Sequence, residues 1–274
     1  MALALALTAP ASALEWSAGI GGDARWFDWR EEAGGQQLLS EMGPLFSPVA
    51  SLELQLDPFY AGVEAAWGGG LARYDGRLQT GAGYEADAWE EIVDTEWRLG
   101  WRNARGGAHL GYMQRDWRRY IEGSGNVSSA EERYRWRLVT LGGEVVLQDA
   151  PQWRLALTVG RPAESYQKVY TSFYDDFTLE PGDGVFWRIS LPYRQPRASG
   201  GVWVIEPYYQ QQDMDASDPR LLRIGGVSQN LLAYQPASVR RELGITLRLQ
   251  FGSVDTPPDP VGTQPQSAPE QQPL

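Results

Sequence analysis

The chain contains no cysteine, and this absence excludes disulfide bridges and thiolate-bound metals. It contains no apolar run of about 18 residues, which excludes a transmembrane helix, and its mean hydropathy is −0.41. These values do not exclude a membrane β-barrel, because such a barrel turns polar side chains toward its lumen and its hydropathy averages out. The chain also lacks an excess of positive charge. The net charge of −11 argues against a nucleic-acid partner.

Motifs of the common catalytic and cofactor-binding sites are absent as well. The sequence has no phosphate-binding loop, nucleophile elbow, dinucleotide fingerprint or zinc-ligand spacing. His109 is the only histidine, and it closely follows a predicted short turn at 103–106, so we expect a structural histidine near one rim rather than a general base. We therefore predict no catalytic, cofactor-binding or metal-ligating residues and no cofactor.

Acidic residues gather in three predicted loops. Grouped carboxylates can bind Ca²⁺ or bridge to lipopolysaccharide through divalent ions, but the twelve-residue spacing of a calcium-binding loop is missing. Solvated surface charge is the interpretation that we prefer for these groups. They are Glu85, Asp87, Glu90 and Glu91 in the first loop, Asp175, Asp176, Glu180 and Asp183 in the second, and Asp213, Asp215 and Asp218 in the third.

What the chain does have is aromatic residues and glycine in a pattern that favours strands. It contains 12 Trp, 13 Tyr and 31 Gly, a mixture that suits strands, tight turns and rings at a membrane interface. In the segment from Trp89 to Trp101, apolar side chains alternate with charged ones, as expected for one outward and one inward face. The two tryptophans are far enough apart to span roughly 28 Å along a membrane normal at about 45° of tilt. A barrel's apolar band is about 25 Å tall with aromatic girdles at its edges. The spacing therefore predicts a membrane-spanning strand.

The clearest alternation is near the end of the chain, from Arg241 to Phe251. Leu243, Ile245, Leu247, Leu249 and Phe251 share one face of the predicted strand, and polar residues and Gly244 share the other. A polar residue, a glycine two positions later and alternating apolar residues up to a closing aromatic resemble the C-terminal assembly signal of Gram-negative outer-membrane β-barrels. The resemblance implies that this strand is read by the barrel assembly machinery. It also implies that the strand closes the barrel against the segment 14–26.

Connection lengths support the same fold. We predict short turns at 57–58, 103–106, 149–152 and about 194–201, and longer connections at about 31–44, 73–87, 120–132, 165–183 and 212–236. Short turns belong on the periplasmic side of such a barrel and long loops on the outside. The sequence therefore predicts an all-β fold, a closed antiparallel up-and-down transmembrane β-barrel of about ten strands that covers 14–252.

The two ends of the chain are predicted to lie outside the barrel. A short apolar run followed by Ala11-Ser12-Ala13 is typical of a signal peptide over 1–13, and the lack of a preceding basic residue indicates a true start upstream or a misplaced Met1. Residues 253–274 are rich in proline and predict a disordered periplasmic tail.

The predicted lumen is rich in charge, and its cations are arginines, because Lys168 is the only lysine. Arginine forms bidentate contacts with carboxylates, and a ten-stranded barrel has little room beyond such side chains, so we favour a filled lumen over an open pore. The predicted inward residues are Glu15, Asp23, Arg25, Glu53, Glu64, Asp94, Glu96, Arg98, Arg102, Arg133, Arg135, Arg137, Glu144, Arg154, Arg188, Glu206, Glu242 and Arg248. Gly142-Gly143 is expected to shift the phase of its strand.

These expectations lead to one function and two alternatives. We expect a non-enzymatic, monomeric outer-membrane barrel in a structural or surface-binding role. Its loops would be extracellular and both termini periplasmic, and its partners would be outer-membrane lipid and lipopolysaccharide. The first alternative is a small porin-like channel for polar solutes. The second is a rim hydrolase like the omptin proteases, whose His/Asp chemistry lies at the extracellular rim, whereas His109 is expected at the other rim.

Overall fold

The computed structural model describes residues 14–77, 82–123, 127–149, 152–198 and 200–253. The predicted signal peptide and nearly all of the predicted tail lie outside these residues. No helix occurs among the described residues, and so none has the length and hydropathy needed to cross a membrane.

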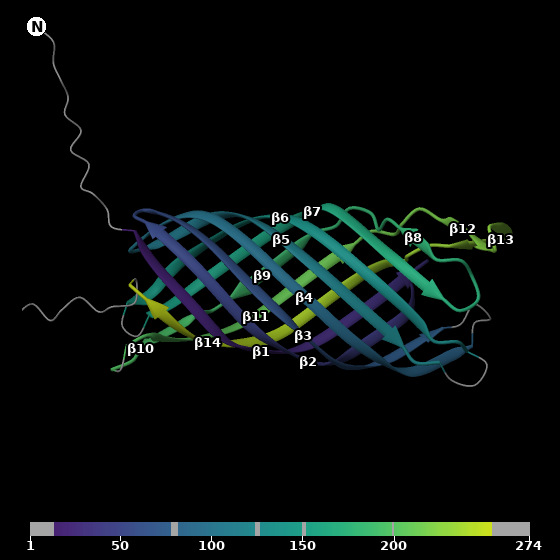
Figure 1. The fold of residues 1–274 in the computed structure, drawn as a ribbon, viewed down its shortest axis with the longest axis horizontal. Helices are drawn as coiled ribbons and strands as arrows, with labels where there is room; N and C mark the ends of the chain where they lie inside the picture. The colour runs from purple at the N-terminus through teal and green to yellow at the C-terminus, as the bar shows by residue number, and fades with distance from the viewer. Residues whose placement is uncertain (1–13, 78–81, 124–126, 150–151, 199, 254–274) are drawn as a thin grey trace, which may run out of the picture.

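The described chain is built almost entirely of antiparallel strands (Figure 1). Seven long strands follow one another as a meander in which each pairs with the next. They are β1 (Glu15–Ala33), β2 (Gln36–Leu56), β3 (Phe59–Arg77), β4 (Gly83–Asn103), β5 (Gly106–Ile121), β6 (Ala130–Asp149) and β7 (Gln152–Thr171). The remaining strands are β8 (Phe177–Leu179), β9 (Phe186–Ser190), β10 (Tyr193–Pro196), β11 (Val202–Met214), β12 (Arg220–Ile224), β13 (Val227–Ala233) and β14 (Ala237–Gly252).

The eighth barrel position is shared by three short strands. β8, β9 and β10 each pair with β7, and β9 and β10 also pair with β11. β12 and β13 form a separate hairpin between β11 and β14. The barrel therefore has ten strand positions, and the predicted fold class is confirmed.

The seam of the barrel is the pairing of β1 with β14. Its register runs from Ser17 opposite Gly252 to Glu32 opposite Ala237. Gly244 faces the lumen, where a Cβ atom would lie 2.6 Å from the Tyr208 ring. Phe251 is exposed on the outside at the end where β1 begins and β14 ends. We call this end the terminal end and the opposite one the distal end. The prediction that the last strand pairs with the first is confirmed.

A belt of exposed apolar side chains surrounds the terminal part of the barrel. Alternation along each strand turns these residues outward while polar residues turn inward. The belt includes Trp16, Ile20, Trp26, Phe46, Leu52, Leu54, Leu56, Phe59, Trp67, Val93, Trp97, Leu99, Trp101, Leu110, Tyr112, Val139, Leu141, Val145, Leu147, Leu155, Leu157, Val159, Ile189, Trp203, Leu243, Ile245, Leu247 and Phe251. On the distal side of this belt the outward residues become charged, as at Asp116 and Arg118 after Tyr112.

The long connections at the distal end are shorter than the sequence predicted. The expected connection at 31–44 is instead a turn at Gly34 and Gly35, whose positive φ angles of 59° and 75° favour glycine. The strands around 73–87, 120–132 and 165–183 also extend beyond the predicted limits, and 212–236 contains the β12–β13 hairpin. The alternation of apolar residues in the sequence ends where the belt ends, but the strands continue to pair through their backbones beyond the belt.

The orientation predicted for three arginines of β6 was wrong. Arg133, Arg135 and Arg137 point outward, and Tyr134 and Trp136 fill the lumen. The expected phase shift at Gly142-Gly143 does not occur, because the irregularities of the β6–β7 ladder lie at 137/138 and 146/148. The irregularity at 137/138 adds a residue to β7 and not to β6, so the alternation that turns Val139 outward also turns the three arginines outward.

Candidate functional site: a lumen filled in three layers

The terminal layer of the lumen is polar and encloses a cavity of about 130 Å³. Arg102 donates hydrogen bonds to Glu53 at 2.7 and 3.2 Å and to Glu144 at 3.0 Å, and its guanidinium lies 4.3 Å from the Tyr60 ring centre. Arg154 bonds the same Glu144. Side chains from β2, β4, β6 and β7 are therefore cross-linked across this end of the barrel.

The middle layer is centred on Glu242, which is completely buried. Arg240 pairs with this carboxylate, the Arg25 Nε atom lies 3.5 Å from it, and the Arg115 Nη1 atom lies 4.0 Å away. Gln210 donates a hydrogen bond of 2.6 Å to Glu242. Arg115 also forms a bidentate pair with Asp94, at 2.6 and 3.0 Å.

Buried aromatic rings form the distal layer. Trp117 stacks on Tyr134 at 4.5 Å and on Trp136 at 5.6 Å between ring centres, and Trp29 meets Trp117 edge-on at 4.9 Å. Phe27 packs against the same group. None of these five rings is more than 2 % exposed, so they form a water-poor layer inside the barrel.

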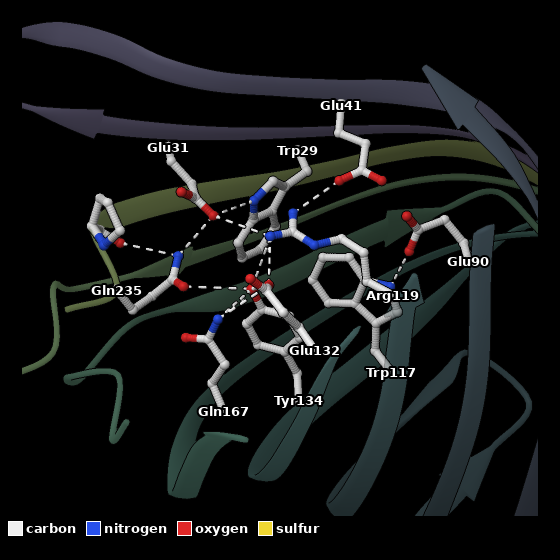
Figure 2. Close-up of polar contacts among 11 residues, drawn as sticks. Trp29, Glu31, Glu41, Glu90, Trp117, Arg119, Glu132, Tyr134, Gln167 and Gln235 are labelled. Atoms are coloured by element: carbon white, nitrogen blue, oxygen red, sulfur yellow. Dashed lines mark hydrogen bonds and ion pairs between the residues drawn. The ribbon is translucent and has the colours of Figure 1, made fainter. Parts of the chain in front are cut away.

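Arg119 lies above these rings at the centre of a polar cluster (Figure 2). Its guanidinium donates to Glu41 at 2.9 Å and to Glu132 at 2.6 Å, and it lies 3.7 Å from Glu31. The charge is also stacked on the aromatic layer, 5.6 Å from the Trp117 ring centre and 5.7 Å from that of Tyr134.

Two glutamines complete this cluster. Gln167 donates to the Tyr134 hydroxyl oxygen at 2.9 Å and to Glu132 at 3.1 Å, and Gln235 donates to Glu31 at 2.9 Å. Gln235 belongs to the segment between β13 and β14, whereas its partner Glu31 belongs to β1. The cluster therefore ties the distal connection to the barrel wall.

Glu90 is a buried carboxylate beside Glu41 in this region. Burial and the neighbouring Glu41 carboxylate raise the pKa of Glu90 well above its ordinary value. The Trp117 indole N–H donates a hydrogen bond to the Glu90 carboxylate. Glu90 lies beyond the apolar belt, since the outward residue next to it, Glu91, is charged.

Sequence reasoning found most of the terminal and middle layers. Apart from the three arginines of β6, the predicted inward residues line the lumen. The residues missing from the predicted lumen include the aromatic rings of the distal layer and the charged residues Glu31, Glu41, Arg115, Arg119 and Arg240. Tyr112 of β5 points outward, so strand alternation beyond it turns Arg115 and Arg119 inward. The sequence pattern therefore contained the information needed to place these two arginines in the lumen.

His109 lies in the terminal layer, as predicted. Its ring packs against Gly142, where a Cβ atom would lie 2.3 Å from the imidazole. It also lines the 130 Å³ cavity together with Arg98 and Glu144. It is remote from the distal end, where the predicted omptin-like chemistry would need a histidine.

The three acidic groups do not behave as units. Glu90 is buried while Glu91 accepts a hydrogen bond from Trp67, and Asp175 caps the turn of the β12–β13 hairpin. Within the part of the chain that the structure describes, no group of three or more histidine, cysteine, aspartate or glutamate residues could hold a metal ion.

Comparison with solved structures identifies the fold. The chain is similar to the outer membrane protease OmpT of Escherichia coli, with a TM-score of 0.53 and 10 % identity over 89 % of this chain and 97 % of OmpT. It is also similar to the translocator domain of the autotransporter NalP of Neisseria meningitidis, with a TM-score of 0.42 and 10 % identity over 84 % of this chain and 87 % of that domain. No protein-family model matches, and neither does any curated protein sequence. The fold is that of the outer-membrane β-barrels, and identities this low establish the fold alone.

Proposed function

We propose that this protein is a closed, non-enzymatic outer-membrane barrel with a structural or surface-binding role. The observation that carries the proposal is the filled lumen, in which buried rings and Arg119 follow two layers of ion pairs. A lumen sealed in this way disfavours the porin-like alternative. The position of His109 disfavours the rim hydrolase, although OmpT, which shares the fold, is a protease.

Membrane residence follows from the outer surface. The closed sheet pairs its backbone groups internally, and the exposed belt gives lipid chains an apolar surface with tryptophans near both edges. The connections at the terminal end are all short, whereas those at the distal end are longer except for the turn at Gly34 and Gly35, and the β12–β13 hairpin extends from the distal end (Figure 1). By the usual asymmetry of such barrels, we assign the distal end to the cell exterior and both termini to the periplasm.

Single engineered cysteines test this orientation without background, because the natural chain has none. Ser228→Cys is exposed on the distal hairpin, and Ala104→Cys is exposed in the turn between β4 and β5. On intact cells, a membrane-impermeant maleimide is expected to label Ser228→Cys strongly. It should label Ala104→Cys only after the outer membrane is permeabilised. The opposite pattern would refute the orientation, and recovery of the protein in the soluble fraction would refute membrane residence.

Lipopolysaccharide is the partner that the outer face of β4 to β7 suits. A hollow of about 400 Å³ there is lined by four cationic and two acidic side chains together with Tyr166 and Tyr170. The charged residues are Arg118, Arg133, Arg135, Lys168, Glu91 and Asp116. This hollow lies just distal to the apolar belt, at the depth where the phosphates of a lipid headgroup would be. Guanidinium groups bind phosphate through paired, charge-assisted hydrogen bonds.

The double variant Arg133→Gln/Arg135→Gln is expected to bind lipopolysaccharide about tenfold more weakly than the wild type, because it loses two charged hydrogen-bond donors. The matched control is Arg73→Gln, which removes an exposed arginine from β3, outside the hollow. Binding can be measured as the lipopolysaccharide concentration that half-saturates the rise in thermal midpoint. Equal affinity in the double variant and the control would show that the hollow is not the site.

A further inference from the structure

The β12–β13 hairpin carries exposed apolar side chains far from the lipid-facing belt. Leu221 is 51 % exposed, Leu232 is 57 % exposed and Val227 is 66 % exposed. Ile224, Leu231, Tyr234 and the nearby Phe173 are also exposed. Figure 1 shows β12 and β13 at the extreme distal end of the barrel. Contiguous apolar exposure of this kind marks an interaction surface.

Leu222 anchors the hairpin, and most of its other residues are exposed. Leu222 is 3 % exposed and packs against the rest of the distal end, whereas Ile224 is 38 % exposed. Leu221 and Arg223 are both exposed, on either side of an irregularity in the β12–β13 register. Leu221 is paired with Leu232 on β13. The exposed surface of the hairpin therefore combines an apolar pair with a guanidinium group.

The tip of the hairpin is held in position. Gly225 and Gly226 form its turn with φ angles of 56° and 82°. Their backbone N–H groups donate to the Asp175 carboxylate at 2.9 and 2.8 Å, and the Asp175 N–H donates to the Arg223 carbonyl at 2.8 Å. Because the exposed side chains are pre-positioned, little conformational entropy is lost when they bind a partner.

The charge of the hairpin identifies the kind of partner. From Pro219 to Arg241 the sequence contains no acidic residue, in a chain that has 35. Arg220 and Arg223 lie at the base and near the tip of β12, and Arg220 makes an exposed contact of 3.5 Å with Glu180. A second copy of the chain would bring together two molecules of net charge −11. Leucine, valine and tyrosine next to arginine, in a segment whose own sequence has no carboxylate, are the composition of segments that enter a lipid interface.

We propose that the β12–β13 hairpin docks onto the surface of a second lipid bilayer that faces the distal end. Leu221, Leu232 and Val227 enter its interfacial region, and Arg220 and Arg223 lie at the level of its phosphates. The proposal deepens the surface-binding role proposed above and rests on it. The barrel's own bilayer surrounds the belt, so the hairpin at the far end meets a different membrane.

Flotation of the whole barrel with vesicles tests this proposal. The refolded protein is held in lipid nanodiscs and mixed with protein-free vesicles of phosphatidylcholine and phosphatidylglycerol in a 7:3 ratio (roughly, to mimic an anionic surface). Nanodiscs that contain the barrel should float with the vesicles, and empty nanodiscs should not. Leu221→Ser/Leu232→Ser should lower the bound fraction at least about tenfold, because two apolar side chains are lost.

Two further variants separate insertion by the hairpin from general hydrophobic adhesion and from attraction by charge alone. Tyr120→Ser, which removes an exposed ring from the distal part of β5, should keep binding within about twofold of the wild type. Arg223→Gln should weaken binding to the anionic vesicles about fivefold and leave binding to pure phosphatidylcholine unchanged.

The proposal would be overturned if nanodiscs that contain the wild-type barrel float with the vesicles no more than empty nanodiscs do. Association of barrel-containing nanodiscs with each other but not with vesicles would overturn it as well, since the hairpin would then be a protein interface. Neither result touches the orientation, which the cysteine labelling measures separately.

Discussion

Replacing Glu242 by glutamine is expected to remove about 3 to 5 kcal/mol from the free energy of unfolding. Glu242 has no exposed surface, and Arg25, Arg115 and Arg240 all face its carboxylate. Glutamine can still accept a hydrogen bond, but it has no charge to offset three guanidinium groups in a water-poor lumen. The loss can be measured by urea unfolding of the protein refolded into lipid vesicles, with tryptophan fluorescence as the signal.

Asp28→Asn provides the matched control for this measurement. Asp28 accepts two hydrogen bonds from Arg30, at 3.0 and 2.9 Å, but on the outer face of β1, where the Arg30 side chain is 39 % exposed. Removing an exposed ion pair of this kind should cost less than about 1 kcal/mol. Replacing Arg240 together with Glu242 should recover part of the loss, because one uncompensated cation fewer remains. A Glu242→Gln protein as stable as Asp28→Asn would refute the role assigned to the middle layer.

The contents of the lumen explain which inward and outward faces could be predicted from the sequence. Where the outside of the barrel is apolar, the alternation of side chains identifies both faces of a strand. The inward and outward faces of the segment from Trp89 to Trp101 were predicted correctly, although the apolar belt includes only its part from Val93 to Trp101. Beyond the belt the outer face meets polar surroundings and the lumen is aromatic, so the pattern inverts. The rule that charge faces inward therefore failed at Arg133 and its neighbours.

The distal strands were missed for a related reason. From Arg30 to Leu39 neither face has a continuous apolar ladder, so hydrophobic periodicity gives no strand signal there. The glycine pair at 34–35 was the available signal, because two-residue hairpin turns favour such pairs. The cluster around Arg119 could not be predicted, because it joins Glu41 of β2, Glu132 of β6 and Gln235 near β14. Only the closed barrel brings these residues together.

Ion conductance measures whether the lumen of the barrel is closed. The refolded protein is inserted into planar lipid bilayers, and insertion is verified by the faster gel migration of the unboiled sample. An open porin in the same bilayer serves as the positive control. Since the rings of the distal layer are almost completely buried, we expect no steady current above the bare-membrane level at moderate voltage. Steady, ohmic single-channel currents from the wild-type protein would contradict a closed lumen and would restore the porin-like function.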